Sequence, residues 1–306
     1  MMATHYETAG APSAPYSEEI ALGDFVALLK PRVMSLVVFT GAVGLVLAPG
    51  TLQPVLAFVA ILCIAVGAGA AGAINMWYDR DIDALMTRTR NRPIPAGRMA
   101  PNVALGFGVT LAVAAVSIMA LALNGVAAGL LAFTIFFYVV IYSMALKRRT
   151  PQNIVIGGAA GAFPPMIGWS AVGGDVTLAS VVLFAIIFLW TPPHFWALAL
   201  YRQNDYDKAG VPMMPVVAGR RSTAWQMFAY TAALLPVTLV PCVIGLSGAI
   251  YGAGALALGL LFLVFAISVI RDTGERSARR MFPFSILYLF LIFVLLLVDQ
   301  SLPVAF

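Results

Sequence analysis

The sequence predicts an all-α membrane protein, a polytopic bundle of nine transmembrane helices. Hydrophobic residues make up 61% of the 306 positions, and the mean hydropathy is +0.95. Repeated apolar runs approach or exceed the about 20 residues that span the core of a bilayer. The positive charges, in addition, gather in a few short segments. A lipid bilayer is therefore the expected surrounding of the chain.

The amino-terminal residues 1–25 are expected to form a flexible cytoplasmic tail, and residues 26–306 a single transmembrane domain. The segment before Leu22 is polar, carries three glutamates and has no compact apolar region, so it does not look like a cleavable signal sequence. Residues 21–30 are interpreted as a short amphipathic approach to the first span.

The 18 lysines and arginines predict the topology. They fall into five segments separated by about 47 to 52 residues without a positive charge, and each separation is long enough for two spans and a tight turn. Because Lys and Arg gather on the cytoplasmic side of short loops, every second loop should be cytoplasmic. The amino terminus is then cytoplasmic and the carboxyl terminus periplasmic. The five segments are 30–32, 80–98, 147–149, 202–221 and 271–280.

Turn residues divide each uncharged stretch into two helices. The turns are expected at residues 48–50, 124–125, 173–175 and 245–248. Each of these segments contains a glycine together with a proline, an asparagine, an aspartate or a second glycine. Glycines between 67 and 72 should let a neighbouring helix approach closely. The predicted helices are 30–48, 53–76, 101–122, 126–146, 152–170, 177–200, 222–243, 250–270 and 281–298.

Several function classes are disfavoured by composition. The net charge of +5 could suggest nucleic acid as a partner, but the charges are confined to short membrane loops, so no nucleic acid is expected. Cys63 and Cys242 lie in different apolar runs and imply neither a disulfide framework nor a cysteine metal site. The sequence contains no Walker loop and no Gly-x-Ser-x-Gly nucleophile motif.

The stretch from Asn75 to Arg98 holds three aspartates and five arginines, in a chain with only 10% charged residues. Asn75, Asp79 and Asp83 stand at i, i+4 and i+8, so on a helix they stay within about 80° of one another, along roughly 12 Å of one face. Hard cations such as Mg²⁺ take oxygen ligands and commonly bind one or two carboxylates plus substrate phosphates. The spacing therefore favours a magnesium site. Asp81 points about 200° away from the centre of this face and should face solvent or pair with an arginine.

Basic residues accompany this acidic face. Guanidinium groups match the geometry of phosphate, which makes Arg88 and Arg92 candidates to hold a diphosphate. Lys147 and Arg148 follow the fourth helix on the same side; positive-inside topology alone explains them, but near a diphosphate they would neutralise leaving-group charge. The alternative for the whole cluster is a solvated interfacial loop.

A second polar concentration runs over residues 191–221. Asp205 and Asp207 are two residues apart and cannot share a helix face. Asp205 is the preferred functional acid because it forms an i, i+4 pair with Tyr201, and Lys208 is a candidate phosphate ligand. Another solvated charged loop is the alternative.

His194 is the only ionisable side chain expected well within a span, which makes it a candidate for a functional site. Pro192 and Pro193 precede it and should kink the helix or free backbone carbonyls. Three roles stay open: ligation of iron, a substrate contact without ligation, or a structural bond to a freed carbonyl.

These motifs resemble the UbiA superfamily of intramembrane prenyltransferases. The run from Asn75 to Pro93 is similar to the first aspartate motif of that superfamily. Residues 152–158, 191–196 and 205–213 look like the branch that farnesylates haem. The resemblance covers nearly the whole chain after the tail. Many members carry a fuller Asp-x3-Asp second motif, whereas position 201 is Tyr here.

The resemblance implies Mg²⁺ as cofactor, farnesyl diphosphate as donor and haem B as acceptor, at the cytoplasmic side of the cell inner membrane. The farnesyl chain would join a haem vinyl group, with addition of a hydroxyl from water and release of diphosphate, to give haem O for terminal oxidases. A haem A synthase or an oxidase assembly factor is a further candidate partner.

Transferred to this sequence, the resemblance implies roles for three sets of residues. The catalytic and magnesium-binding residues would be Asn75, Asp79, Asp83 and Asp205. The cations that bind the diphosphate would be Arg88, Arg92, Lys147, Arg148 and Lys208, and the contact to haem would be His194. Rival interpretations are the same chemistry on another aromatic or chlorin acceptor, a secondary transporter of an anionic substrate, and an assembly scaffold. Transporters usually show inverted repeats, and no repeat is visible here.

Overall fold

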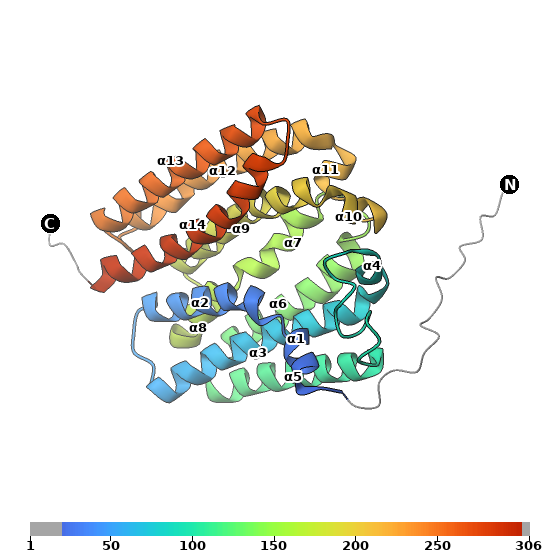
Figure 1. Ribbon diagram of the computed structural model, residues 1–306. Helices are drawn as coiled ribbons and strands as arrows, with labels where there is room; N and C mark the ends of the chain where they lie inside the picture. Colours follow the sequence, from blue (N-terminus) through green and yellow to red (C-terminus); the bar gives the residue numbers. More distant parts are fainter. Residues whose placement is uncertain (1–19, 302–306) are drawn as a thin grey trace.

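The computed structural model describes residues 20–301, and every regular element within them is a helix (Figure 1). The predicted flexible tail lies mostly outside the described residues, and its last four positions belong to the first helix. The elements are α1 (Leu22–Leu28), α2 (Pro31–Leu47), α3 (Pro54–Tyr78), α4 (Arg80–Leu85), α5 (Pro101–Ala122), α6 (Gly125–Phe136), the π-helix η1 (Phe137–Leu146), α7 (Asn153–Ala162), α8 (Pro164–Gly173), α9 (Leu178–Tyr201), α10 (Gln203–Lys208), α11 (Met214–Val217), α12 (Gly219–Val243), α13 (Ala249–Arg271) and α14 (Arg276–Ser301).

The membrane spans agree with the prediction. Among the described residues, eight helical stretches are long and apolar enough to cross a membrane, and a ninth is obtained if α1 and α2, which meet at a 53° bend, count as one span. The largest boundary differences are at the first span, which begins at Leu22 if α1 is included, and at α14, which begins at Arg276, both earlier than expected. The nine-helix membrane bundle is therefore confirmed.

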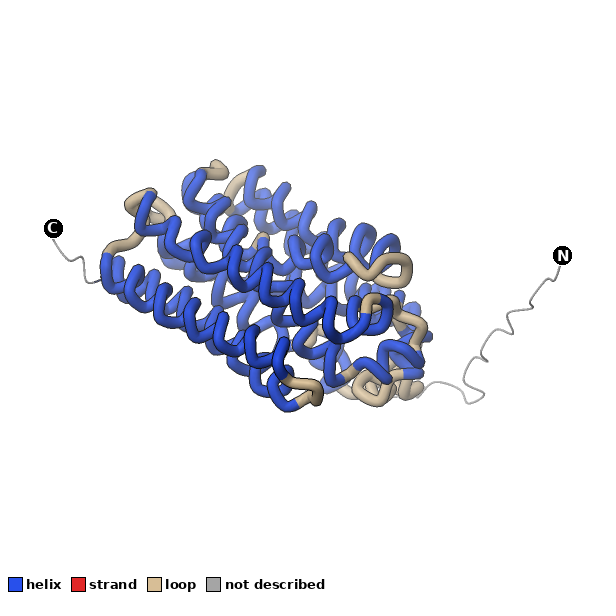
Figure 2. Tube along the Cα trace, turned by 90° about the horizontal axis from the view of Figure 1, so that it is seen from above, coloured by secondary structure: helices blue, strands red, loops and turns tan. Residues whose placement is uncertain are grey.

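The bundle is made of long rods whose connecting loops gather at the two ends (Figure 2). The short helices α4, α10 and α11 all lie at one end, on the right in Figure 1. This end carries both of the polar segments that the sequence singles out. Close packing at the glycines of α3 is confirmed, because a Cβ at Gly67 would lie 2.8 Å from the side chain of Leu131.

The span formed by α6 and η1 changes its winding halfway. Residues 137–146 form a π-helix, a rare winding with i→i+5 hydrogen bonds that occurs often at functional sites. Its last bond runs from the amide of Lys147 to the carbonyl of Tyr142, at 2.8 Å. Gly157 of α7 faces the ring of Tyr142 so closely that a Cβ at this position would overlap the ring. The glycine therefore sets the distance between α7 and η1.

Replacing Gly157 with Ala is expected to displace η1 and to destabilise the protein by about 1–3 kcal/mol, the usual cost of overpacking a tight contact. The measurement is thermal unfolding of the purified protein in detergent. Gly161→Ala is the matched control, because a Cβ there would meet nothing within 4 Å. Equal melting temperatures for the two variants would contradict the assigned contact.

Candidate functional site

The first polar segment forms one buried cluster at the C-terminal end of α3. The amide of Asp79 donates to the carbonyl of Asn75 at 2.9 Å, and the amide of Asp83 donates to the carbonyl of Asp79 at 2.8 Å. This helical bonding continues across the boundary between α3 and α4, so the three predicted side chains stay on one face. Nδ2 of Asn75 lies 2.6 Å from Oδ2 of Asp79. Asn75 is 3% exposed and both aspartates are fully buried.

Three of the predicted cations contact these aspartates. Lys147 forms an ion pair with Oδ2 of Asp79, and Arg148 lies 3.6 Å from Oδ1 of the same residue. Arg92 pairs with Oδ2 of Asp83 at 2.6 Å. The structure thus brings together basic side chains from two separate loops, which follow α4 and η1, around one acidic face.

Two members of the cluster are missed by sequence reasoning. Nζ of Lys30 donates to Oδ1 of Asn75 at 2.8 Å, and Nδ2 of Asn75 donates to Oγ of Ser143 at 2.9 Å. Lys30 stands at the bend between α1 and α2 with φ of 51°, which is uncommon outside glycine and concentrates at functional sites. Its position just before Pro31 is the only local signal in the sequence, and this signal indicates topology without indicating a contact to Asn75.

The donor set fits a hard divalent cation. Oδ1 of Asp79 and Oδ1 of Asp83 are buried and accept no hydrogen bond. Unsatisfied carboxylate oxygens are costly in a protein interior and are the ligands that Mg²⁺ prefers. No group of three or more Asp, Glu, His or Cys side chains that could hold a metal ion occurs in the part of the chain that the structure describes. A cation here would bind two carboxylates and take further oxygens from a substrate.

Asp81 stands apart from this cluster. Its carboxylate, 61% exposed, accepts two hydrogen bonds of 2.6 Å from Arg148. Partial burial alone would raise the pKa of Asp81, but the hydrogen bonds from Arg148 and from the Ile82 amide outweigh it and hold the pKa below its ordinary value. The expected pairing of Asp81 with an arginine is confirmed.

The second polar segment is arranged differently from the expectation. α9 ends at Tyr201 and a separate short helix, α10, carries Asp205, so the two residues do not share one continuous helix. The ring of Tyr201 faces the guanidinium of Arg279 at 4.8 Å, whereas Asp205 lies 4.0 Å from Arg202. The break occurs because the helical hydrogen bonding changes at Arg202, whose amide donates to the carbonyls of both Leu198 and Ala199.

Three predicted residues are not joined to the buried aspartates. Within residues 20–301, no hydrogen bond or ion pair connects Arg88, Asp205 or Lys208 with Asp79 or Asp83. Arg88 and Lys208 are exposed. These assignments stay predictions.

His194 lies in α9, which continues through Pro192 and Pro193 without interruption. Its Nδ1 lies 2.7 Å from Oγ of Ser285 on α14. Of the three roles left open for His194, the structural one therefore takes another form, in which the ring bonds to a side chain of a second helix instead of to a carbonyl freed by the prolines.

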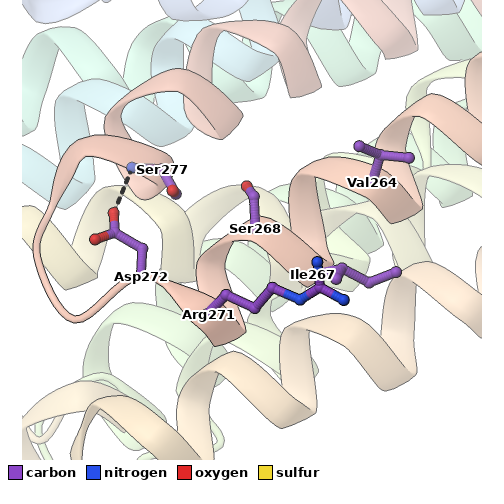
Figure 3. A pocket seen from close by; sticks show the side chains of 6 residues that line it. All are labelled: Val264, Ile267, Ser268, Arg271, Asp272 and Ser277. Carbon is purple, nitrogen blue, oxygen red and sulfur yellow. Dashed lines mark hydrogen bonds between the residues drawn. The ribbon is translucent and has the colours of Figure 1, made fainter.

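A hollow at the protein surface is separate from all of these groups (Figure 3). It lies along α13 and the start of α14, where Asp272 accepts a bond of 2.8 Å from the amide of Ser277. None of the predicted site residues lines it. Its lining residues are Val264, Ile267, Ser268, Arg271, Asp272 and Ser277.

Comparison with known proteins places these features in context. The sequence matches the UbiA prenyltransferase family over residues 37–296. It is 62% identical over 283 residues to the protoheme IX farnesyltransferase of Parvibaculum lavamentivorans, covering 91% of this chain and 89% of that protein. The corresponding protein of Acidiphilium cryptum is 60% identical over 287 residues, covering 91% and 90%.

Solved structures resemble the fold. A UbiA homologue from Archaeoglobus fulgidus bound to DMAPP and Mg²⁺ superposes with a TM-score of 0.67 at 17% identity, over 89% of this chain and 99% of that one. A structure of digeranylgeranylglyceryl phosphate synthase gives a TM-score of 0.76 at 16% identity, over 91% and 98%. At such identities the likeness concerns the fold alone.

Proposed function

Because the chain belongs to the UbiA prenyltransferase family and is thus a multi-span membrane prenyltransferase, we propose that it transfers the farnesyl group of farnesyl diphosphate to a vinyl group of haem B. The products are haem O and diphosphate, and Mg²⁺ is the proposed cofactor. One observation carries the proposal: the 62% identity to a protein named protoheme IX farnesyltransferase, across nearly the whole of both chains.

The buried cluster supports the donor half of this reaction. Asp79 and Asp83 have the unsatisfied oxygens that would hold Mg²⁺, and the metal would supply positive charge to the departing diphosphate. Asn75 bonds to Asp79 and thereby fixes the orientation of its carboxylate. Lys147, Arg148 and Arg92 are the cations closest to these carboxylates and would bind the phosphate oxygens.

The chemical steps balance with water as the only added reactant. The bond between C1 of the farnesyl group and the phosphate oxygen breaks, and its electron pair leaves with the diphosphate. The allylic carbon bonds to the haem vinyl group, water adds its oxygen to the resulting cation, and one proton is released. The cations described above stabilise the developing negative charge, while the apolar helices around the site exclude bulk water that would quench the allylic cation.

The remaining predicted residues keep proposed roles that rest on the motif resemblance. Arg88 and Lys208 are proposed as further phosphate contacts, Asp205 as an additional magnesium ligand, and His194 as a haem contact. The site would face the cytoplasmic side of the inner membrane, in a single domain of residues 26–306. The product would pass to a haem A synthase or an oxidase assembly factor.

The test is a reconstituted reaction. Purified full-length protein in detergent is given haem B, farnesyl diphosphate and Mg²⁺, and the pigments are analysed by mass spectrometry. Farnesylated, hydrated haem is expected, with loss of turnover after chelation by EDTA and recovery when Mg²⁺ is restored. An aromatic acid and a chlorin serve as competing acceptors. Folded protein that prenylates either of these but not haem would refute the proposal.

A further inference from the structure

The contact between α9 and α14 fixes the proton of one imidazole. Oγ of Ser285 donates its only hydrogen to the carbonyl of Phe282 at 2.6 Å. It can therefore only accept the bond of 2.7 Å that it shares with Nδ1 of His194. Nδ1 must then carry the proton of the neutral ring, and Nε2 is left with a free lone pair.

The ring is also held in one plane. His194 stacks against Trp190 at 4.2 Å with an interplanar angle of 17°, and against Phe282 at 4.8 Å with an angle of 21°. Nε1 of Trp190 donates to the backbone carbonyl of Ser285 at 2.7 Å. Ser285 thus anchors both the imidazole and one of the aromatic rings that flank it, and the direction in which Nε2 points is fixed.

The free nitrogen has no protein partner. No hydrogen bond to Nε2 of His194 exists among residues 20–301, although the side chain is only 8% exposed. Nε2 is not sealed off by protein atoms but keeps some accessible surface, so a ligand can reach its lone pair. A histidine that binds a metal typically donates its other N–H to a neighbouring oxygen, which fixes the tautomer and raises the basicity of the ligating nitrogen.

We propose that Nε2 of His194 binds the iron of the haem substrate and that Ser285 is the positioning residue that makes this nitrogen available. The inference rests on the proposed function, which supplies haem as the acceptor. His194 precedes the inner end of α9 by about two turns, or roughly 10 Å. The iron would thus be held inside the apolar bundle, on the side of the carboxylate cluster.

The first test compares haem with metal-free protoporphyrin IX, each titrated into purified full-length protein. His194→Ala is expected to weaken binding of ferric haem by more than about 10-fold and to remove the iron–imidazole stretching band from the resonance Raman spectrum of the ferrous complex. Binding of protoporphyrin IX should be nearly unchanged, because it has no iron. An equal loss for both pigments would show a contact to the ring and overturn the proposal.

His194→Cys serves as a ligand switch that stays informative if the alanine variant folds poorly. Cysteine is small and tolerated in apolar interiors. The haem absorption spectrum is expected to change from imidazole to thiolate ligation, which happens only if position 194 contacts the iron. A haem complex of this variant that keeps the imidazole signature would overturn the proposal.

The role of Ser285 has its own test. Ser285→Ala is expected to weaken haem binding about 10-fold and to lower the frequency of the iron–imidazole band, and Ser285→Thr should restore both because it keeps the hydroxyl. Ser268→Ala is the matched control, since Ser268 makes the same type of bond to the carbonyl of Phe265 on α13. An unchanged band in Ser285→Ala would refute the positioning role.

The two proposals fail separately. If the wild-type protein farnesylates haem but its haem complex shows no imidazole ligation, only the inference about His194 and Ser285 falls. If the protein shows imidazole ligation by His194 but makes no farnesylated haem, the ligation stands and the proposed reaction falls.

Discussion

Asp79→Asn is expected to lower kcat/KM for prenyl transfer by about 1,000-fold, at the upper end of what one electrostatic contact contributes to catalysis. Asp79 is fully buried, has one unsatisfied carboxylate oxygen and lies beside Lys147 and Arg148. The amide keeps the shape of the side chain but removes the charge that a divalent cation requires. The measurement is turnover at saturating Mg²⁺, with the yield of farnesylated haem followed by mass spectrometry.

Asp81→Asn provides a matched control two residues further along, on the opposite side of the helix. It removes the same charge from a side chain that is exposed and bound only to Arg148. Its kcat/KM is expected to stay within about threefold of the wild type, as for a surface ion pair. Similar losses in the two variants would mean that net charge at the C-terminal end of α3 matters, and not the position of Asp79.

Lys147→Gln is expected to lower kcat/KM by about 100-fold, because the departing diphosphate would lose a cation held next to Asp79, the proposed metal ligand. Lys147 is largely buried and its ion pair with Asp79 places it there before substrate arrives. Most of the loss should appear in kcat, since negative charge on the leaving oxygen grows in the transition state.

Arg149→Gln is the control for this loop. Arg149 follows two residues later and is exposed. Its replacement should leave kcat unchanged within about twofold, as expected for a solvated surface charge. A large effect at Arg149 together with a small one at Lys147 would show that the loop acts through its overall charge.

Features that depend on composition and charge could be predicted from the sequence. The spans follow from apolar length and from the separation of lysines and arginines, and both are properties of the chain before it packs. The end of α3 at Tyr78 lies close to the predicted end at residue 76. The predicted acidic face extends across this boundary and is kept, since the amide bonds of Asp79 and Asp83 continue the helical spacing. Predictions that rest on contacts four residues apart survive such a break when the bonding is kept.

Contacts between distant segments could not be predicted in the same way. Lys30 is 45 residues from Asn75, and Ser143 is 68 residues away, so no spacing rule connects them. The link between His194 and Ser285 spans 91 residues. The separation of Tyr201 from Asp205 shows the opposite case, in which a local rule assumed a continuous helix and the bonding at Arg202 interrupted it.

The pairing of the buried carboxylates with the protein's own cations also has a thermodynamic consequence. A metal ion arriving alone would compete with Lys147 for Asp79, and a diphosphate arriving alone would compete with Asp79 for Lys147. When both ligands bind, Asp79 contacts the metal and Lys147 contacts the phosphate, so each side chain that loses its ion-pair partner gains another. The two ligands should therefore bind with positive cooperativity, and by linkage each must raise the affinity of the other by the same factor.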